Sequence, residues 1–211
     1  MVAQVVTVAQ QKGGAGKTTL VVQLATALAE AGRKVGIMDI DPQGSLTTWM
    51  RRREQLGPEV RELRFAMVGG WRLGVELDRL KGGLDLVLID SPPHAETEAK
   101  AAIRAADLVL IPCQPSLLDV WASGPTVELA AKEGRRAVIV LNRVPPRGRS
   151  FDEARAAISE LACRSLDAHL GNRQAFVAGI ARGLGAVESE PKSAAAMEAR
   201  ALAGEVVGRR G

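Results

Sequence analysis

A glycine-rich segment near the start of the chain has the residue types that bind a phosphate chain. It follows an aliphatic run at residues 5–9 and opens a stretch with helical periodicity. Glycines let successive backbone N–H groups turn toward an anionic phosphate, a lysine reaches the outer phosphates, and a hydroxyl can ligate Mg²⁺. The pattern predicts a P-loop for a nucleoside triphosphate. The expected phosphate-binding residues are Gly13, Gly14, Ala15, Gly16, Lys17, Thr18 and Thr19.

The loop departs from the usual P-loop pattern, GxxxxGK[ST]. That pattern has glycine five residues before Gly16, where this chain has Gln11, and a second lysine, Lys12, follows. The resulting form, KGGxGK[ST], resembles the ParA/MinD family of deviant Walker A P-loop ATPases, and within it the short ParA-type partition and positioning ATPases. The resemblance implies that ATP and Mg²⁺ are the cofactors. It also implies that Lys17 acts on the phosphates of its own subunit, and that Lys12 reaches those of a partner across a nucleotide-sandwich dimer.

Two aspartates follow the aliphatic run at residues 35–38, in the segment Asp39-Ile40-Asp41-Pro42-Gln43-Gly44. A carboxylate at a strand end beside a phosphate loop can hold Mg²⁺ or orient an attacking water. The DxDPQG signature is frequent in the family that the chain resembles, and its second aspartate serves hydrolysis. We therefore assign Asp41 to the nucleophilic water and the metal, and Asp39 to a supporting role. A turn that only ends the strand is the alternative interpretation.

A third candidate is the aspartate that ends the apolar run 84–89. Asp90 precedes Ser91, Pro92 and Pro93, a sequence close to the DTPP of the resembled family. This is the Walker B arrangement, in which the carboxylate acts on Mg²⁺ and shares the metal with Thr18. Apolar runs that end in aspartate are common, so this feature alone does not identify a Walker B motif. The following residues, Ser91, Pro92 and Pro93, strengthen the assignment.

Two further segments resemble walls of the family's nucleotide pocket. Pro115, in the sequence IPCQP that precedes Asp119, corresponds to a P-x-x-P stretch near the base and the dimer face. Asn142 lies where the family places an asparagine against adenine, and a side-chain amide can pair with the N6 and N7 edge of that base. A turn residue at a strand end is the alternative for Asn142.

Composition and periodicity favour an α/β fold. The chain has 211 residues, 46% of them apolar but only 3% aromatic, which suits buried aliphatic strands covered by helices. We expect one doubly wound, mostly parallel sheet flanked by helices, in a single domain over residues 1–211. Expected strands lie at residues 5–9, 35–38, 84–89, 108–111 and 137–141, with a possible strand at 60–66. Expected helices lie at residues 18–31, 71–80, 152–162 and 193–207.

Several classes of protein are not expected. The start of the chain has no pattern of a signal peptide, and no apolar run approaches the roughly 18 residues of a membrane span. Cys113 and Cys163 lack the spacing of a zinc site or of a disulfide framework. These features favour the cytoplasm.

Positive charge is concentrated modestly in the last third of the chain. The formal net charge is +4, and residues 143–211 contain 11 Lys or Arg against 8 Asp or Glu. Such a surface can bind DNA phosphates without reading sequence, although scattered solvated arginines are the alternative. Residues 51–53 form another basic run. They could contribute to such a surface or could equally be the exposed end of a helix. The arginines considered are Arg143, Arg147, Arg149, Arg173, Arg182, Arg209 and Arg210.

The family resemblance extends over nearly the whole chain and implies a working cycle. ATP favours a homodimer, the dimer binds nonspecific DNA on the nucleoid, and a ParB-type adaptor on the cargo stimulates hydrolysis. The cargo is plasmid DNA, chromosomal DNA or a protein cluster, and the sequence does not choose among them.

Three alternatives share the same loop. A MinD-like membrane-cycling ATPase needs a bulky amphipathic C-terminal helix, which residues 199–211 do not offer. An ATP-dependent amide ligase needs further acid or base groups, and only His94 lies near the expected site. A nitrogenase-reductase-like protein needs cluster-binding cysteines with a different spacing.

Overall fold

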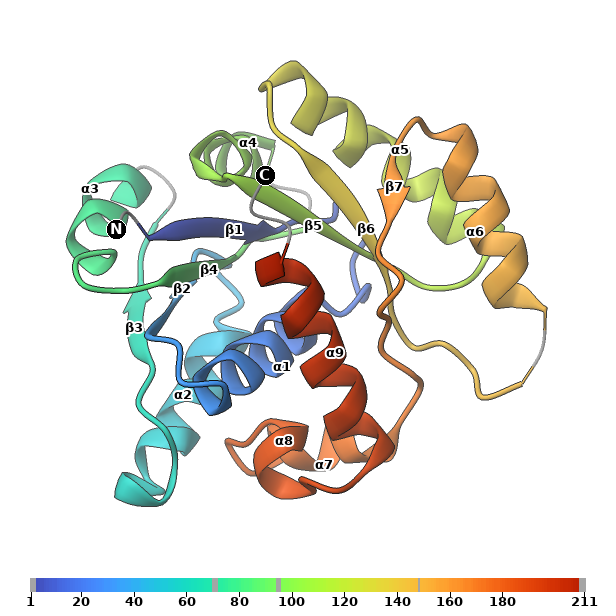
Figure 1. Ribbon diagram of the computed structural model, residues 1–211. Helices are drawn as coiled ribbons and strands as arrows, with labels where there is room; N and C mark the ends of the chain where they lie inside the picture. Colours follow the sequence, from blue (N-terminus) through green and yellow to red (C-terminus); the bar gives the residue numbers. More distant parts are fainter. Residues whose placement is uncertain (1–2, 70–71, 94–95, 148, 209–211) are drawn as a thin grey trace.

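The computed structural model describes residues 3–69, 72–93, 96–147 and 149–208. Its strands form one sheet in the order β3-β2-β4-β1-β5-β6-β7, and every strand pair is parallel (Figure 1). The strands are β1 (Gln4–Val8), β2 (Val35–Asp39), β3 (Arg64–Met67), β4 (Leu86–Asp90), β5 (Leu108–Cys113), β6 (Ala137–Leu141) and β7 (Arg164–Ser165). The expected doubly wound parallel α/β fold is confirmed.

Helices cover both faces of this sheet. One face packs against α1 (Lys17–Glu30), α2 (Ser45–Glu54), α7 (Gln174–Ala181), α8 (Ala186–Ser189) and α9 (Ala194–Gly208). The other packs against α3 (Leu73–Leu80), α4 (Glu96–Ala105), α5 (Leu117–Lys132) and α6 (Ser150–Glu160). A short 3₁₀ helix, η1 (Gly57–Glu59), follows α2. None of the helices in the described ranges is long and apolar enough to cross a membrane.

Burial on both faces explains the aliphatic strands. All residues of β2, β4 and β5 are buried, and in α1 the side chains of Leu20, Leu24 and Leu28 are at most 1% exposed. A strand between two helical layers has no solvent face, so it needs no alternation of polar residues. The central strands were recognisable from the sequence for this reason.

The register of the central strands brings their carboxyl ends together. Asp90 of β4 is the pairing partner of Val8 in β1 on one side and of Asp39 in β2 on the other. The chain leaves β1 through the glycine-rich loop and leaves β2 through the Asp-Pro segment. Ligands of open parallel sheets bind at this edge, where the strand order reverses.

Several element boundaries differ from expectation. The possible strand at 60–66 is the shorter β3, and the helix expected at 71–80 begins at Leu73, while Trp71 lies outside the described residues. The two-residue β7 was not predicted, because its length is too short to give a periodic pattern.

The basic run at the end of α2 is not simply an exposed helix end. Arg53 is 2% exposed, and its guanidinium donates to both carboxylate oxygens of Glu188 at 2.6 and 2.8 Å. It also lies over the ring of Trp49, 5.3 Å from the ring centroid. This pair joins α2 to α8, and only Arg51 and Arg52 of the run are exposed.

A close backbone approach in the same region predicts a stability difference. Gly183 has φ +75°, and a Cβ there would lie 2.7 Å from the backbone nitrogen of Arg53, whereas Gly134 has φ +64° and open space around it. Gly134→Ala should cost about 1 kcal/mol, because only the left-handed backbone is penalised. Gly183→Ala should cost about 1–3 kcal/mol more, because the backbones of two segments must separate. Urea unfolding of both variants measures the difference, and equal losses would contradict this packing.

Candidate nucleotide-binding site

The glycine-rich loop has the backbone shape of a phosphate cradle. Gly14 and Gly16 have φ +74° and +92°, a region that favours glycine. Gly16 then accepts the first helical hydrogen bond of α1, from the backbone nitrogen of Leu20 at 2.9 Å. The loop therefore ends at a helix N-terminus, where free N–H groups and the helix dipole favour an anion.

A buried glutamine fastens the start of the loop to α5. The Gln10 amide donates to the hydroxyl of Ser123 at 2.9 Å, and its carbonyl oxygen accepts from the hydroxyl of Thr126 at 3.3 Å. Gln10 is 3% exposed. Sequence analysis missed this anchor, because its partners lie more than a hundred residues away and have no motif of their own.

Lys17 is already held in place at the mouth of the loop. Its ammonium donates to the backbone carbonyl of Gln10 at 3.1 Å, and the residue is 7% exposed. Burial lowers the pKa of Lys17, and the nearby carboxylates of Asp90 and Asp41 oppose that shift. The lysine is thus a poorly solvated cation beside the phosphate cradle, where an anionic ligand gains most from it.

Thr18, in the first turn of α1, and Asp90, at the end of β4, form the expected pair. The Thr18 hydroxyl donates to Asp90 Oδ2 at 2.7 Å, while Asp90 Oδ1 is buried and has no hydrogen-bond partner among the described residues. Burial raises the pKa of Asp90 to about 7. Asp39 and Asp41 add to this rise, and Thr18 and Lys17 oppose it.

This donor set fits Mg²⁺. An unpartnered buried carboxylate oxygen beside a hydroxyl is the arrangement that a metal ion would complete. Within the described ranges no cluster of three or more His, Cys, Asp or Glu could hold a metal ion alone. Mg²⁺ usually takes one or two protein oxygens and completes its shell with phosphates and water. Thr18 and Asp90 would supply those protein oxygens.

The two aspartates after β2 have different environments. Asp39 is fully buried, and its Oδ2 accepts from the backbone nitrogen and the hydroxyl of Thr47 at 2.8 and 2.7 Å. Asp41 is half-buried, and its Oδ1 accepts from the backbone nitrogen of Gln43 at 2.9 Å. Asp39 therefore fixes the turn into α2, whereas Asp41 is open to water near Lys17.

Lys12 lies against its own subunit. Its ammonium is 2.9 Å from Asp119 Oδ1, and the lysine side chain is 40% exposed. Asp119 belongs to the first turn of α5, which Ser116 caps. The contact to a partner's phosphates stays a prediction, and it requires Lys12 to leave Asp119.

Asn142 contacts the glycine-rich loop directly. Its amide nitrogen donates to the carbonyl of Ala15 at 2.9 Å, its amide oxygen accepts from the backbone nitrogen of Arg143, and the residue is 2% exposed. A Cβ at Gly16 would lie 2.3 Å from that amide nitrogen. The asparagine thus positions the loop, and its contact with adenine stays a prediction.

A narrow hollow of about 60 Å³ lies beside Asn142. The segment after β7 and helix α7 complete its wall, and the sequence offered no motif there. Half-buried Pro115 follows β5, next to Gln114, whose amide reaches the carbonyl of Gly14 at 3.5 Å. The lining residues of the hollow are Thr19, Asn142, Arg143, Gly171, Asn172, Arg173, Phe176, Val177 and Ile180.

The basic residues of the last third are not equivalent. Arg173 is ion-paired with Glu198 at 2.5 Å, so its charge is compensated. Arg209 and Arg210 lie outside the described residues, as does His94. Of the arginines considered for DNA binding from the sequence, Arg143, Arg147, Arg149 and Arg182 are exposed.

A parallel sheet with a glycine-rich loop between β1 and α1, and with Asp90 beside Thr18, defines a P-loop nucleotide-binding protein. The model of the CobQ/CobB/MinD/ParA nucleotide-binding domain family matches residues 6–186. The chain belongs to that family, and the predicted ParA/MinD relationship is confirmed.

Relatives and solved structures agree with this membership. The chain is 35% identical to maintenance of carboxysome distribution protein A of Gloeobacter kilaueensis, over 93% of this chain and 89% of that protein. It is 31% identical to protein ParA of Rhizobium radiobacter, over 82% and 81%. The structure of MinD from Pyrococcus horikoshii OT3 with Mg-ADP matches with a TM-score of 0.82 at 22% identity, over 97% and 96%. The ATP complex of McdA from Cyanothece matches with 0.79 at 19%, over 99% and 98%.

The burial of Asp90 predicts a pH dependence of stability without nucleotide or Mg²⁺. Its folded-state pKa of about 7 lies above the ordinary value of 3.8 for an aspartate. Its contribution to the free energy of unfolding is therefore fully present below pH 3.8 and is lost as the pH rises through 7. Asp90→Asn should remove this dependence, and the free energy of unfolding of the variant relative to wild type should increase between about pH 4 and pH 7. Urea unfolding at several pH values measures it. A constant difference would show that Asp90 ionises as freely as in water.

Proposed function

We propose that this protein is a partition or positioning ATPase of the ParA type. In the proposed cycle, two subunits dimerise on ATP, bind DNA without sequence preference, and release it after a ParB-type adaptor on the cargo stimulates hydrolysis. The cargo is plasmid or chromosomal DNA, or a protein cluster. The protein works in the cytoplasm, on the nucleoid.

The observation that supports this function best is the grouping of Lys12, Lys17, Asp41 and the Thr18–Asp90 pair at one sheet edge. ATP and Mg²⁺ fit this group, and related structures contain Mg-ADP or an ATP analogue with magnesium. Mg²⁺ would neutralise phosphate charge. Lys17 would bind the phosphates, and Asp41 would orient the attacking water.

The fold alone does not separate this proposal from its alternatives. MinD and a cobyrinic acid a,c-diamide synthase have the same architecture, at 22% and 23% identity. Two relatives above 30% identity that extend over at least four fifths of both chains are named for carboxysome distribution and as ParA. These relatives favour positioning over membrane cycling or amide ligation.

A linkage explains how ATP could control DNA binding. If the γ-phosphate favours the dimer, two subunits combine their cationic surfaces on one DNA molecule. More phosphates are then neutralised, and the affinity for DNA rises steeply at low salt. Slow hydrolysis would set the lifetime of the bound state.

Asp41 should be needed for turnover and not for binding. Asp41→Ala should keep ATP binding, ATP-dependent dimerisation and DNA binding, because the phosphate cradle is intact. Steady-state hydrolysis should fall by about 10²-fold or more, because the attacking water is no longer oriented. Phosphate release assays and sedimentation of the same sample measure both properties. Wild-type turnover in this variant would remove Asp41 from its role.

Lys12 should be needed for the dimer and not for the nucleotide. Lys12→Ala should bind ATP as a monomer, because the loop backbone and Lys17 remain in place while the contact to the partner's phosphates is lost. Asp119→Asn is the matched control, because it releases Lys12 from its own subunit and should leave ATP-dependent dimerisation possible. Sedimentation velocity with ATP distinguishes them. An ATP-dependent dimer of Lys12→Ala would contradict the contact across the interface.

A further inference from the structure

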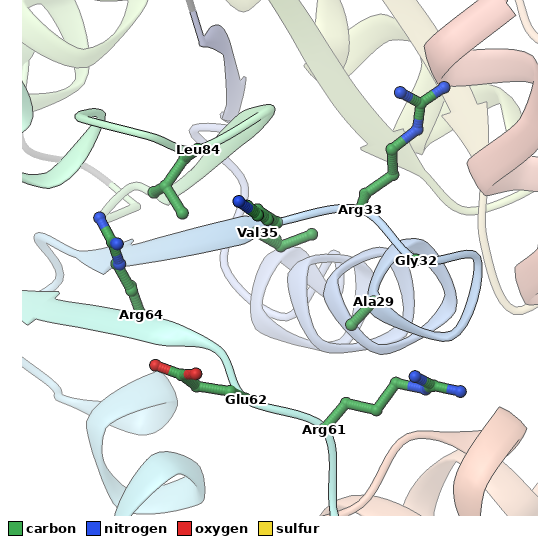
Figure 2. A pocket seen from close by; sticks show the side chains of 9 residues that line it. Ala29, Gly32, Arg33, Val35, Arg61, Glu62, Arg64 and Leu84 are labelled. Carbon is green, nitrogen blue, oxygen red and sulfur yellow. The ribbon is translucent and has the colours of Figure 1, made fainter.

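A basic hollow lies at the end of the sheet opposite the nucleotide site. Figure 2 shows the side chains that line it. Its volume is about 320 Å³. It is formed where α1 ends and β2 begins, and by the segment that enters β3. Since α1 has 14 residues, the hollow is about 20 Å from the phosphate cradle along that helix. Its lining residues are Ala29, Gly32, Arg33, Lys34, Val35, Arg61, Glu62, Arg64 and Leu84.

The charges of this hollow are largely uncompensated. Four cations and one carboxylate line it, a formal charge of +3. Arg33, Lys34 and Arg61 form no side-chain ion pair within the part of the chain that the structure describes, and Arg64 donates only to the carbonyl of Gly82. The neighbouring Glu30 is bound by Arg200 at 2.7 Å, and Arg61 also lies close enough to lower the pKa of Glu30, although the two form no ion pair. Elsewhere, by contrast, exposed arginines such as Arg79 and Arg104 are paired with glutamates.

The backbone under these cations is fixed. The backbone nitrogen of Arg33 donates to Leu28 at 3.0 Å, and that of Lys34 donates to the carboxylate of Asp85 at 2.8 Å. The carbonyl of Arg61 accepts from the buried guanidinium of Arg53 at 2.8 Å. The cations are therefore presented from a rigid frame, which lowers the entropic cost of binding an anion.

We propose that the phosphate backbone of duplex DNA binds across this hollow. Figure 2 shows Arg33 and Arg61 extending outward on opposite sides of the end of α1, with Arg64 on the far side of Val35. Cations that diverge in this way match a long polyanion that crosses the mouth, and not a compact phosphate that lies inside. The inference rests on the proposed DNA binding, but it places the contact at Arg33, Lys34, Arg61 and Arg64 instead of in the last third of the chain.

The test compares DNA binding by two variants that lose the same charge. Arg33→Ala/Arg61→Ala removes two unpaired cations of the hollow. Arg79→Ala/Arg104→Ala removes the same number of arginines outside the hollow, and each of these is ion-paired with a glutamate. Fluorescence anisotropy measures the affinity of each, with ATP and Mg²⁺, for a duplex of arbitrary sequence over a series of salt concentrations.

The hollow variant should bind DNA about tenfold or more weakly at low salt. Its slope of log K against log salt should be shallower by about 2 for each subunit that contacts the duplex. The control should keep the wild-type slope, and both variants should keep wild-type ATP binding and unfolding midpoints. A wild-type slope in the hollow variant would overturn the inference, as would loss of binding only in Arg147→Ala/Arg149→Ala. Tight binding of tripolyphosphate to the hollow without a change in the DNA slope would also overturn it. Failure of the wild-type protein to bind DNA would overturn the proposed function as well.

Discussion

The site depends on one electrostatic constraint, the burial of Asp90 beside other carboxylates. Parallel register places Asp90 next to Asp39, and both are at most 1% exposed. Burial and the neighbouring carboxylate of Asp39 disfavour the ionised form of Asp90, so the site needs positive charge. Lys17 supplies part of it, and the unpartnered oxygen of Asp90 leaves room for a divalent cation. The sheet thus creates a site that a magnesium nucleotide would complete.

The surrounding structure holds this arrangement from several directions. Gln10 fastens the loop to α5, Asn142 supports it from β6, and Asp39 fixes the turn that carries Asp41. Each contact ties a residue at the carboxyl end of a strand to another part of the site. Movement of Asp41 after nucleotide binding would therefore be passed to α2, which follows it in the chain, and movement of Lys12 would be passed to α5, which carries its partner Asp119.

The parts of the protein that are determined by a local sequence pattern could be predicted from the sequence. The loop, the central strands and the strand-ending aspartates follow from residue types within about ten positions. The remaining contacts could not be predicted, because they join segments that are distant in the sequence and have no pattern of their own. The Gln10–Ser123 bond, the burial of Arg53 against Glu188 and the wall formed by α7 are examples. The basic hollow was missed for the same reason, since Arg33 and Arg61 become neighbours only when β2 and β3 pair.

Nucleotide-controlled binding of DNA is the central claim, and it is tested most directly with the unmodified protein. The measurement is binding to long DNA of arbitrary sequence with ATP, with ADP and without nucleotide, each at two salt concentrations. The account predicts salt-sensitive binding with ATP and little binding in the other two states. Equal binding in all three states, or none in any, would contradict it.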